Sequence, residues 1–224
     1  MSDIIFIKEY FKQRYGVDVK YITSTTEFRE PRPPNKMKTL GLERNGYLLF
    51  VARLTPQKGL PYLLKAFNQV KTDKKLVIAG DVDPGDALDD YVGELKAMAD
   101  DRTVFLGWVY ADLLDELYTN AFAFVLPSET EGLSVSLLEA INFGCGVVVS
   151  DIPENLDALQ DYGFAFKSGD ADDLARVLQR LVDHPELVEE KRDKGRTYVR
   201  DRYGIKAVVD SLEQTYRQML GRDE

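Results

Sequence analysis

The stretch AFAFVLPSETEGLSVSLLEAINFGCGVVVSD, residues 121–151, contains two apolar runs on either side of a helical segment. The runs AFAFVLP (121–127) and GVVVSD (146–151) are nearly continuous in apolar residues, which is typical of strands covered on both faces in a parallel sheet. We predict a helix over SLLEAINF (136–143) between them. Parallel strands joined through a helix form a βαβ unit with a right-handed crossover.

The same alternation extends to both sides of this stretch. We predict further strands at 47–53, 75–80, 103–108 and 162–167, and further helices at 59–71, 89–100, 111–121, 153–160 and 170–183. Strand and helix alternate six times, which indicates an α/β fold: a Rossmann-like, doubly wound sheet of about six parallel strands flanked by helices. Two polar-rich helices are predicted to follow, near 185–202 and 205–220. Such sheets bind ligands at the carboxyl ends of their strands, so we expect chemistry in the strand-to-helix loops.

The N-terminal part of the chain has a different pattern. Apolar residues at nearly helical spacing predict a helix over 4–15, and VDVKYI (17–22) alternates like a strand. Three prolines within 31–34 then indicate an extended linker. We therefore divide the chain into 1–44, a helix-strand extension with a proline-rich linker, and 45–224, one Rossmann-like domain with C-terminal helices.

Composition and charge exclude several classes of protein. The 224 residues include 29 Lys and Arg against 38 Asp and Glu, and the net charge of −9 argues against a nucleic-acid or anionic-membrane partner. The single cysteine, Cys145, excludes an intramolecular disulfide, and we interpret it as a small core side chain. The single histidine, His184, argues against a His/Cys metal cluster and a Ser-His-Asp triad, and we expect it at a helix start. The charged N-terminal sequence is unlike a signal peptide or membrane span, so we expect a soluble, cytoplasmic protein.

The loop ARLTPQKGL places two cations around a predicted helix start. Arg53 ends a strand, and Lys58 lies just before the helix. Together with the free N–H groups and dipole of the helix end, two such cations suit a diphosphate. The alternative is a solvated arginine and a lysine at a helix start, although a lysine is slightly unfavourable there.

The loop SETEGLSVSLLEAINFG carries two carboxylates eight residues apart, Glu131 and Glu139. If the helix starts near Ser134 or Ser136, Glu131 lies in the loop, Glu139 lies in the first turns, and both can face one pocket. The alternative is structural: Ser136-x-x-Glu139 reads as a capping box, with Glu131 a solvated loop acid.

A third loop, LGWVYADLLDELY, could read a nucleobase through backbone groups near Trp108 and Val109. The alternative is that Trp108 is a partly buried packing residue. The chain has no G-x-G-x-x-G motif after a strand, so the nicotinamide-dinucleotide fingerprint is missing.

These segments occur in an order that resembles a known family: LFVARLTPQKGLPYLLKAF, KKLVIAGD, VFLGWV, AFVLPSETEGLSVSLLEAINFGCGVVVSD and GFAFKSGDADDLARVL. The chain resembles the C-terminal, donor-binding domain of GT-B glycosyltransferases, in the large retaining group called glycosyltransferase family 4. The resemblance covers about 45–220. Its most specific element is the Glu-x7-Glu pair with the upstream Arg-x4-Lys.

The resemblance implies roles for the charged residues. Arg53 and Lys58 would neutralise the donor diphosphate and stabilise the departing nucleotide. Glu139 would accept hydrogen bonds from the ribose hydroxyls, and Glu131 would contact hydroxyls of the transferred sugar. The resemblance thus makes Glu131, Arg53 and Lys58 the catalytic candidates.

The resemblance also implies backbone contacts and a substrate class. The N–H groups of Gly132, Leu133 and Ser134 would face sugar and phosphate oxygens. The base site would be lined by Gly107, Trp108 and Val109. The implied substrate is a nucleoside-diphosphate-sugar of the UDP or GDP type, and neither a cofactor nor a metal is expected.

The resemblance further implies that part of the enzyme lies outside this sequence. Family members hold the acceptor in a first Rossmann-like domain, and the opening FIKEYFKQRYGVDVKYI is similar only to the last helix and strand of that domain. We expect the chain to bind a nucleotide-sugar, to lack full activity, and to need the missing acceptor domain or a partner chain. The interdomain face left exposed could self-associate. The full-length parent could lie peripherally at a membrane.

Two other functions stay open. The segment TSTTEF (23–28) stands where the family usually has a Pro-Asn-Gly turn, which motivates a non-catalytic or engineered α/β module that retains only the fold. The chain could also come from another GT-B enzyme, a nucleotide-sugar epimerase or a phosphorylase. The Glu-x7-Glu pattern argues against the epimerase, and the absence of a pyridoxal-binding lysine context argues against the phosphorylase.

Overall fold

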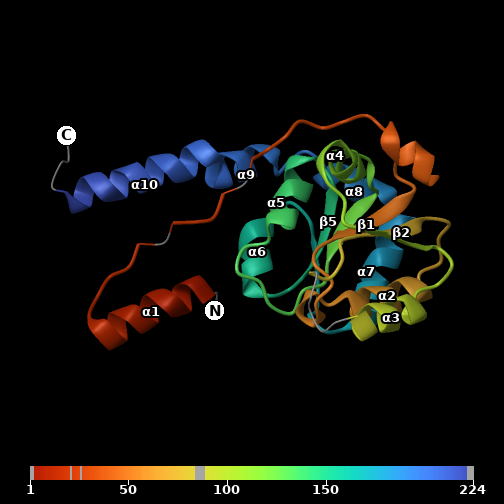
Figure 1. The fold of residues 1–224 in the computed structure, drawn as a ribbon, viewed down its shortest axis with the longest axis horizontal. Helices are drawn as coiled ribbons and strands as arrows, with labels where there is room; N and C mark the ends of the chain where they lie inside the picture. The colour runs from red at the N-terminus through yellow and green to blue at the C-terminus, as the bar shows by residue number, and fades with distance from the viewer. Residues whose placement is uncertain (1–2, 21, 26, 84–88, 221–224) are drawn as a thin grey trace.

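The computed structural model describes residues 3–20, 22–25, 27–83 and 89–220. Its centre is a six-stranded sheet, in which every pairing is parallel and the strand order is β3-β2-β1-β4-β5-β6 (Figure 1). The strands are β1 Tyr47–Val51, β2 Lys75–Ala79, β3 Thr103–Gly107, β4 Ala123–Leu126, β5 Gly146–Ser150 and β6 Phe164–Phe166. The predicted Rossmann-like sheet of six parallel strands is confirmed.

Helices cover both faces of the sheet because successive residues of each strand point to opposite faces. In β1, Leu48 and Phe50 pack on one face, while Leu49 packs on the other. The first face is covered by α2 Leu60–Gln69, α3 Asp89–Met98, α7 Ala171–Asp183 and α8 Pro185–Lys191. The second face is covered by α4 Ala111–Asn120, α5 Val135–Asn142, α6 Pro153–Leu159 and α9 Arg196–Tyr203.

The strand order places a topological switch point in the middle of the sheet. From β1 the chain moves outward through β2 to β3, and it then returns to pair β4 with the other edge of β1. The helices after β1 and β4 therefore lie on opposite faces of the sheet, and ligands of such sheets bind at the carboxyl ends of the strands at this switch point.

The N-terminal segment confirms one prediction and corrects another. The helix α1 spans Asp3–Tyr15, close to the predicted 4–15. The predicted strand at 17–22 is wrong, because residues 17–20 and 22 form neither a strand nor a bridge; Tyr21 lies outside the described residues. Alternating residues make a strand only beside a neighbouring strand, and no strand of the described chain pairs with this segment.

Residues 22–25 and 27–35, which we call the strap, run across the outside of the helical layer toward a 3-10 helix at Lys36–Leu40 (Figure 1). This short helix belongs to the core, because Met37 and the following Leu42 are buried with the second face of the sheet. The Glu116 carboxylate of α4 accepts hydrogen bonds from the backbone N–H groups of Asn35 and Met37, at 2.8 and 3.0 Å. The segment before β1 is thus anchored to α4.

Residues 185–220 contain three helices, so the single helix predicted near 185–202 is wrong. The chain breaks between α8 and α9, where Asp193 has a φ of 60°. At this break Arg192 contacts the segment just before β4, where its Nη2 donates to the carbonyl oxygens of Ala121 and Phe122 at 2.8 and 2.9 Å. The charge-assisted hydrogen bonds of Arg192 with these carbonyl groups favour a break in the helix at this residue. The spacing of apolar residues along the sequence does not reveal such contacts.

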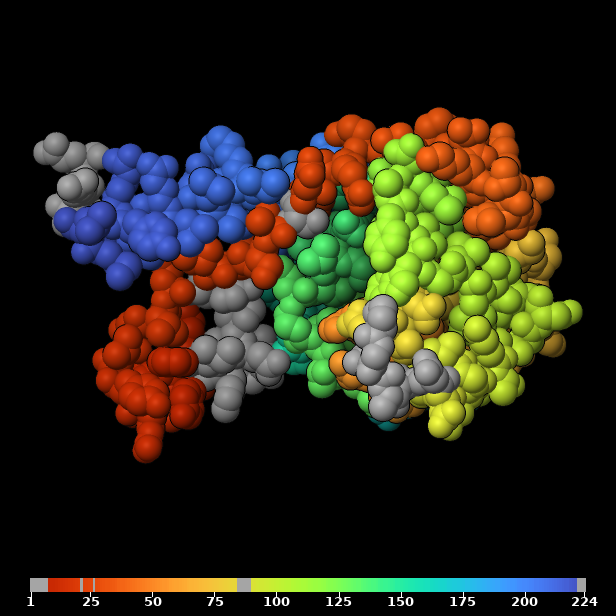
Figure 2. Space-filling model, viewed as in Figure 1, coloured from red at the N-terminus to blue at the C-terminus, as the bar shows by residue number. Residues whose placement is uncertain are grey.

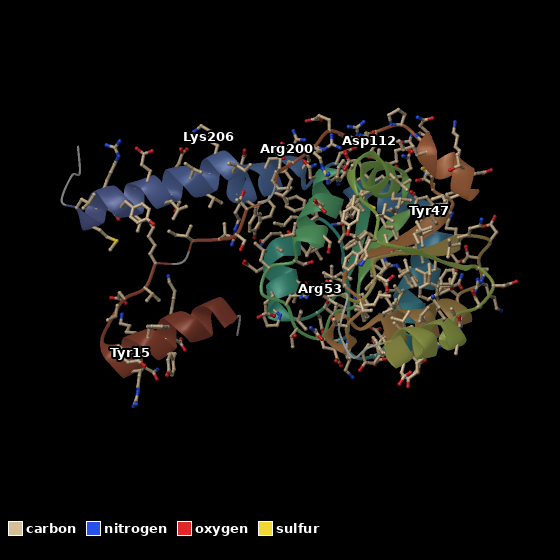
Figure 3. All side chains as sticks on the ribbon, viewed as in Figure 1. Tyr15, Tyr47, Arg53, Asp112, Arg200 and Lys206 are labelled. Atoms are coloured by element: carbon tan, nitrogen blue, oxygen red, sulfur yellow. The ribbon has the colours of Figure 1, made fainter. Side chains whose placement is uncertain are left out.

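The last helix, α10 Ile205–Met219, projects from the body together with α1 (Figures 1 and 2). Figure 3 shows Lys206 on this projection and Tyr47 inside the body, where the tyrosine hydroxyl donates to the Leu117 carbonyl at 2.7 Å. Within the described chain, no helix combines the length and the apolar character that crossing a membrane requires. Cys145 is buried in the core and His184 precedes the first residue of α8, as predicted.

Candidate functional site

A cavity of about 350 Å³ lies at the carboxyl ends of β1, β2 and β3, and the loop after β4 closes one side of it. It occupies the switch point of the sheet, where the strand order predicts a ligand crevice. The lining residues are Val51, Ala52, Arg53, Lys58, Ala79, Gly80, Trp108, Val109, Tyr110, Leu114, Glu131, Leu133, Ser134, Val135 and Ser136. Seven of the ten predicted site residues therefore line one cavity, whereas Gly107, Gly132 and Glu139 are not part of its lining.

The centre of the site is an ion pair between Lys58 and Glu131. The lysine Nζ lies 2.7 Å from Oε1 and 2.9 Å from Oε2 of the carboxylate. The Glu131 side chain is only 6% exposed, so water screens this pair weakly. The two residues come from loops after different strands, and a backbone hydrogen bond from the Glu129 N–H to the Gln57 carbonyl, 2.9 Å, ties these loops together.

Gly59 permits this close approach of the two loops. It has a φ of 68°, and a Cβ at this position would lie 2.0 Å from the Pro127 carbonyl oxygen. A side chain would therefore push the Lys58 loop away from the end of β4.

A buried hydroxyl also orients Glu131. Ser128 donates to Glu131 Oε1 at 2.6 Å, and its own carbonyl accepts a hydrogen bond from the Ser150 hydroxyl. Asn155 Nδ2 reaches the same Ser150 hydroxyl at 2.9 Å. Ser128, Ser150 and Asn155 are all buried, so a chain of polar contacts runs from the start of α6 to the Glu131 carboxylate.

Arg53 is held less firmly than Lys58. Its guanidinium pairs with Asp83 of the loop after β2 at 2.9 Å, and both side chains are about half exposed to solvent. Exposed pairs of this kind contribute about 0–1 kcal/mol, so Arg53 can exchange Asp83 for another anion at little cost.

The third loop forms an aromatic wall. The rings of Trp108 and Tyr110 are stacked, with centroids 6.3 Å apart and planes 17° apart. Trp108 is 39% exposed, so it is neither a core residue nor fully solvated. Beside it, the Gly107 carbonyl accepts a hydrogen bond from the Gly80 N–H at 2.7 Å, which fixes the start of the loop.

The helix α5 begins with its N-terminus at the cavity. Its cap is Ser134, whose Oγ accepts a hydrogen bond from the Leu137 N–H at 3.4 Å. The capping box with Ser136 is therefore wrong: the helix starts two residues earlier, and the Ser136 Oγ instead lies 3.1 Å from the Ser134 Oγ. The first N–H groups of α5 are free to meet a negative group, which the helix dipole favours.

Glu139 lies one turn further along α5 than Val135, on the same face of the helix. Its carboxylate contacts Arg29 of the strap at 3.3 Å and lies beside the buried Tyr118 phenol and Asp115. Burial raises the pKa of Glu139, and the neighbouring Arg29 guanidinium partly opposes this rise.

Several polar residues of this site were not predicted from the sequence. Ser128 stands only three residues before Glu131, and this short separation in the sequence could have predicted the hydrogen bond between them. Asp83 lies in a loop rich in aspartate, and no feature of the sequence distinguishes it from the other aspartates as the partner of Arg53. Arg29 is 110 residues from Glu139 in the chain, and no local pattern reveals their contact.

The family model of the glycosyl transferases group 1 matches residues 33–201, about three quarters of the chain. An uncharacterised glycosyltransferase of Methanocaldococcus jannaschii is 42% identical over 107 residues, which are 47% of this chain and 27% of the relative. The Escherichia coli UDP-Gal:alpha-D-GlcNAc-diphosphoundecaprenol alpha-1,3-galactosyltransferase is 29% identical over 195 residues, 83% of this chain and 49% of the relative. The chain thus spans half or less of the length of these curated relatives.

Solved structures establish the same fold. Sucrose-phosphate synthase from Thermosynechococcus elongatus superposes with a TM-score of 0.79 at 23% identity, over 95% of this chain and 56% of that one. Anabaena HepE, solved in complex with UDP and glucose, superposes with a TM-score of 0.74 at 21% identity, over 82% of this chain and 51% of that one. The resemblance to the C-terminal domain of GT-B glycosyltransferases is confirmed, whereas membership of family 4 stays a prediction. By its sequence match and its fold, the chain belongs to the glycosyl transferases group 1 family.

Proposed function

We propose that this chain is the donor-binding half of a retaining glycosyltransferase, which transfers a sugar from a nucleoside-diphosphate-sugar to an acceptor hydroxyl. The observation that carries the proposal is the convergence of Lys58, Arg53 and the N-terminus of α5 on one cavity at the switch point. The cavity thus brings together the positive end of a helix dipole and two cations, each paired with a carboxylate, Lys58 with Glu131 and Arg53 with Asp83.

The diphosphate would lie between the two loops that carry the cations. Arg53 would leave Asp83 to bind phosphate oxygens through its planar guanidinium. Lys58 would approach the diphosphate while still contacting Glu131, because its ammonium group has three donors. As the bond to the sugar breaks, negative charge grows on the nucleotide, and cations already in place stabilise that charge.

The other predicted residues would bind the two ends of the donor. Glu131 would accept hydrogen bonds from sugar hydroxyls, and its orientation is fixed by Lys58 and Ser128. The base would lie near Gly107, Trp108 and Val109, where the half-exposed indole offers a flat face. Glu139 would accept hydrogen bonds from the ribose hydroxyls. We propose no metal or cofactor for this step.

We propose that acceptor binding needs protein beyond these 224 residues, supplied by a further domain or a partner chain. The projecting α10 supports this, because a stripe of apolar residues along it lacks a packing partner in the described structure. Its exposed members are Ile205, Val209, Tyr216 and Met219, and Leu220 continues them. They recur at helical spacing, so they form one face suited to docking.

A thermal-shift series with UDP, GDP, ADP and dTDP tests the proposal, run with magnesium and again with a chelator. A ligand at 100 times its dissociation constant stabilises the folded state by about 2.7 kcal/mol. For a chain of this size each kcal/mol raises the melting temperature by roughly 2–4 °C. We expect one nucleotide to give such a shift, in both buffers, and the Arg53→Ala variant to reduce it.

The matched control is Lys65→Ala, which removes an exposed cation of α2 that does not line the cavity. Its shift should equal that of the unmodified chain. No shift with any of the four nucleotides would contradict donor binding and favour the alternative function, a non-catalytic α/β module that retains only the fold.

A further inference from the structure

From Thr25 onward, the strap contacts the helices α4, α5 and α9 through several hydrogen bonds and ion pairs. Its Thr25 hydroxyl donates to the Tyr203 carbonyl at 2.8 Å, and its Glu30 pairs with Arg200 of α9 at 2.9 Å. The Arg29 carbonyl accepts a hydrogen bond from Asn142 Nδ2 of α5 at 2.8 Å. The backbone of Arg29 is therefore fixed on the same helix that carries Glu139.

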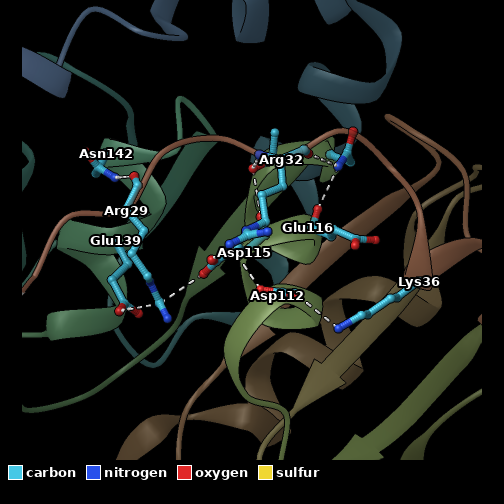
Figure 4. Close-up of polar contacts among 10 residues, drawn as sticks. Arg29, Arg32, Lys36, Asp112, Asp115, Glu116, Glu139 and Asn142 are labelled. Atoms are coloured by element: carbon cyan, nitrogen blue, oxygen red, sulfur yellow. Dashed lines mark hydrogen bonds and ion pairs between the residues drawn. The ribbon is translucent and has the colours of Figure 1, made fainter.

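The Arg29 side chain lies between two carboxylates from different helices (Figure 4). Its Nη2 is 3.3 Å from Glu139 Oε1 of α5 and 3.1 Å from Asp115 Oδ1 of α4. Asp115 is 1% exposed, and its other oxygen pairs with Arg32 Nε at 3.2 Å. Two strap cations thus neutralise a buried aspartate and the glutamate next to it.

We propose that Arg29 is a positioning residue for donor binding, which holds Glu139 as a charged acceptor for the ribose hydroxyls and so makes recognition of the ribose depend on the strap. This inference rests on the proposed function, because it assigns an upstream partner to Glu139. It adds a residue outside the loops at the carboxyl ends of the strands.

The charge of Glu139 decides how many hydroxyls it can bind. An ionised carboxylate only accepts hydrogen bonds and can hold two neighbouring hydroxyls, whereas a protonated carboxyl group loses part of this capacity. A single Arg29 nitrogen contacts a single Glu139 oxygen, which leaves acceptor capacity on the carboxylate.

The groups around Glu139 show why Arg29 is needed. Burial raises the pKa of Glu139, and the nearby Asp115 raises it further. Arg29 lowers the pKa, and the neighbouring Tyr118 phenol, which burial keeps neutral, lowers it too. Without Arg29, two adjacent carboxylates would share only Arg32, which contacts Asp115 and not Glu139. The proton would then bind Glu139 at a higher pH.

The experiment compares each ribonucleoside diphosphate with its 2′,3′-dideoxy counterpart, using UDP, GDP and ADP. Affinities are measured by calorimetry from pH 6.5 to 9 for the unmodified chain and for Arg29→Gln, Arg29→Lys and Glu139→Gln. The matched control is Glu30→Gln, which neutralises the exposed neighbouring residue of the strap and leaves the contacts of Arg29 with Asn142 and Glu139 in place. Melting temperatures identify any variant that fails to fold.

We expect Arg29→Gln to weaken the ribonucleotide about tenfold at pH 7 and to leave the dideoxy form unchanged. Its ribonucleotide affinity should recover as the pH rises, because Glu139 then ionises without help. Arg29→Lys should restore most of the affinity, and Glu30→Gln should behave like the unmodified chain. Glu139→Gln should lose the preference for ribose at every pH.

Three results would overturn the proposal. If Arg29→Gln weakens both nucleotide forms equally, Arg29 has only a structural role. If Glu139→Gln removes the ribose preference but neither Arg29 variant changes it, Glu139 works without Arg29, and the proposed function still stands. If the unmodified chain binds none of the nucleotides, the proposed function fails, and this inference fails with it.

Discussion

Lys58 holds both oxygens of the Glu131 carboxylate, at 2.7 and 2.9 Å from its Nζ. The cation that we assign to the diphosphate is thus joined to the carboxylate that we assign to the sugar. A change at one residue should alter the orientation of the other, because the two side chains are joined by two hydrogen bonds and little water reaches the pair.

Lys58→Met should weaken nucleoside-diphosphate binding about tenfold to a hundredfold, because a charge-assisted contact contributes about 1.5–3 kcal/mol. The variant also leaves Glu131 buried with Ser128 as its remaining partner at the site, so the melting temperature should fall. Calorimetry and a melting curve measure both effects. Lys65→Met, on the exposed side of α2, should change neither. Unaltered affinity in Lys58→Met would exclude a role for this lysine in phosphate binding.

Asp83→Asn should strengthen nucleoside-diphosphate binding, because it frees Arg53 before the ligand arrives. The exposed pair contributes at most about 1 kcal/mol, so the gain should not exceed about fivefold. It should shrink at high salt, where exposed charges are screened. Titrations at low and high ionic strength measure this, with Asp101→Asn as the exposed-acid control. A loss of affinity would mean that Asp83 itself helps to bind the ligand.

Gly59→Ala should destabilise the chain and displace Lys58, since the new Cβ would lie 2.0 Å from the Pro127 carbonyl oxygen at a positive φ. The expected loss is about 1–3 kcal/mol from backbone strain alone. Gly93→Ala is the matched control: this glycine lies within α3, and a Cβ there meets no atom within 4 Å. The control should gain about 0.5–1 kcal/mol. Chemical denaturation measures the change in the free energy of unfolding for both variants. Equal changes in Gly59→Ala and Gly93→Ala would contradict the close approach of the backbone at Gly59.

Cys145 should not react with a disulfide reagent in the native state. Burial raises the pKa of its thiol to about 12. At pH 8 only about one thiol in ten thousand would then be ionised, and the thiolate is the reactive form. The rate should rise with pH and should jump when guanidinium unfolds the chain. Rapid reaction of the folded protein at pH 8 would show that the core opens around this residue.

The alternation of apolar and helical segments predicted the sheet because its four central strands, β2, β1, β4 and β5, are almost entirely buried and the helices that cover them pack apolar residues against the sheet. Around β4, α5 and β5, the residues that end each apolar run are visible in the sequence itself, so the sequence pattern alone predicted these elements. The same reasoning failed at 17–22, where alternation has no neighbouring strand to satisfy it. It also failed at Arg192, where contacts with distant carbonyl groups end the helix.

The sequence predicted those residues of the site that stand in the loops directly after strands. Arg53, Lys58 and Glu131 share the cavity because parallel strands bring their carboxyl ends to one edge of the sheet. The pairing within the site could not be predicted, since side-chain partners depend on loop conformation. Lys58 bonds Glu131 rather than remaining free, and Glu139 meets Arg29 rather than closing a capping box with Ser136.

The strap has a consequence for the order in which the molecule assembles. Its contacts join Thr25 with Tyr203 and Glu30 with Arg200, pairs that are 178 and 170 residues apart. Closing such long loops is entropically costly until the sheet and α9 already exist. Although it precedes the sheet in the chain, the strap would therefore take its place after the sheet has formed. The surroundings of Glu139 would mature late, so a nascent or partly refolded chain could have its phosphate-binding loops in place before it distinguishes a ribose.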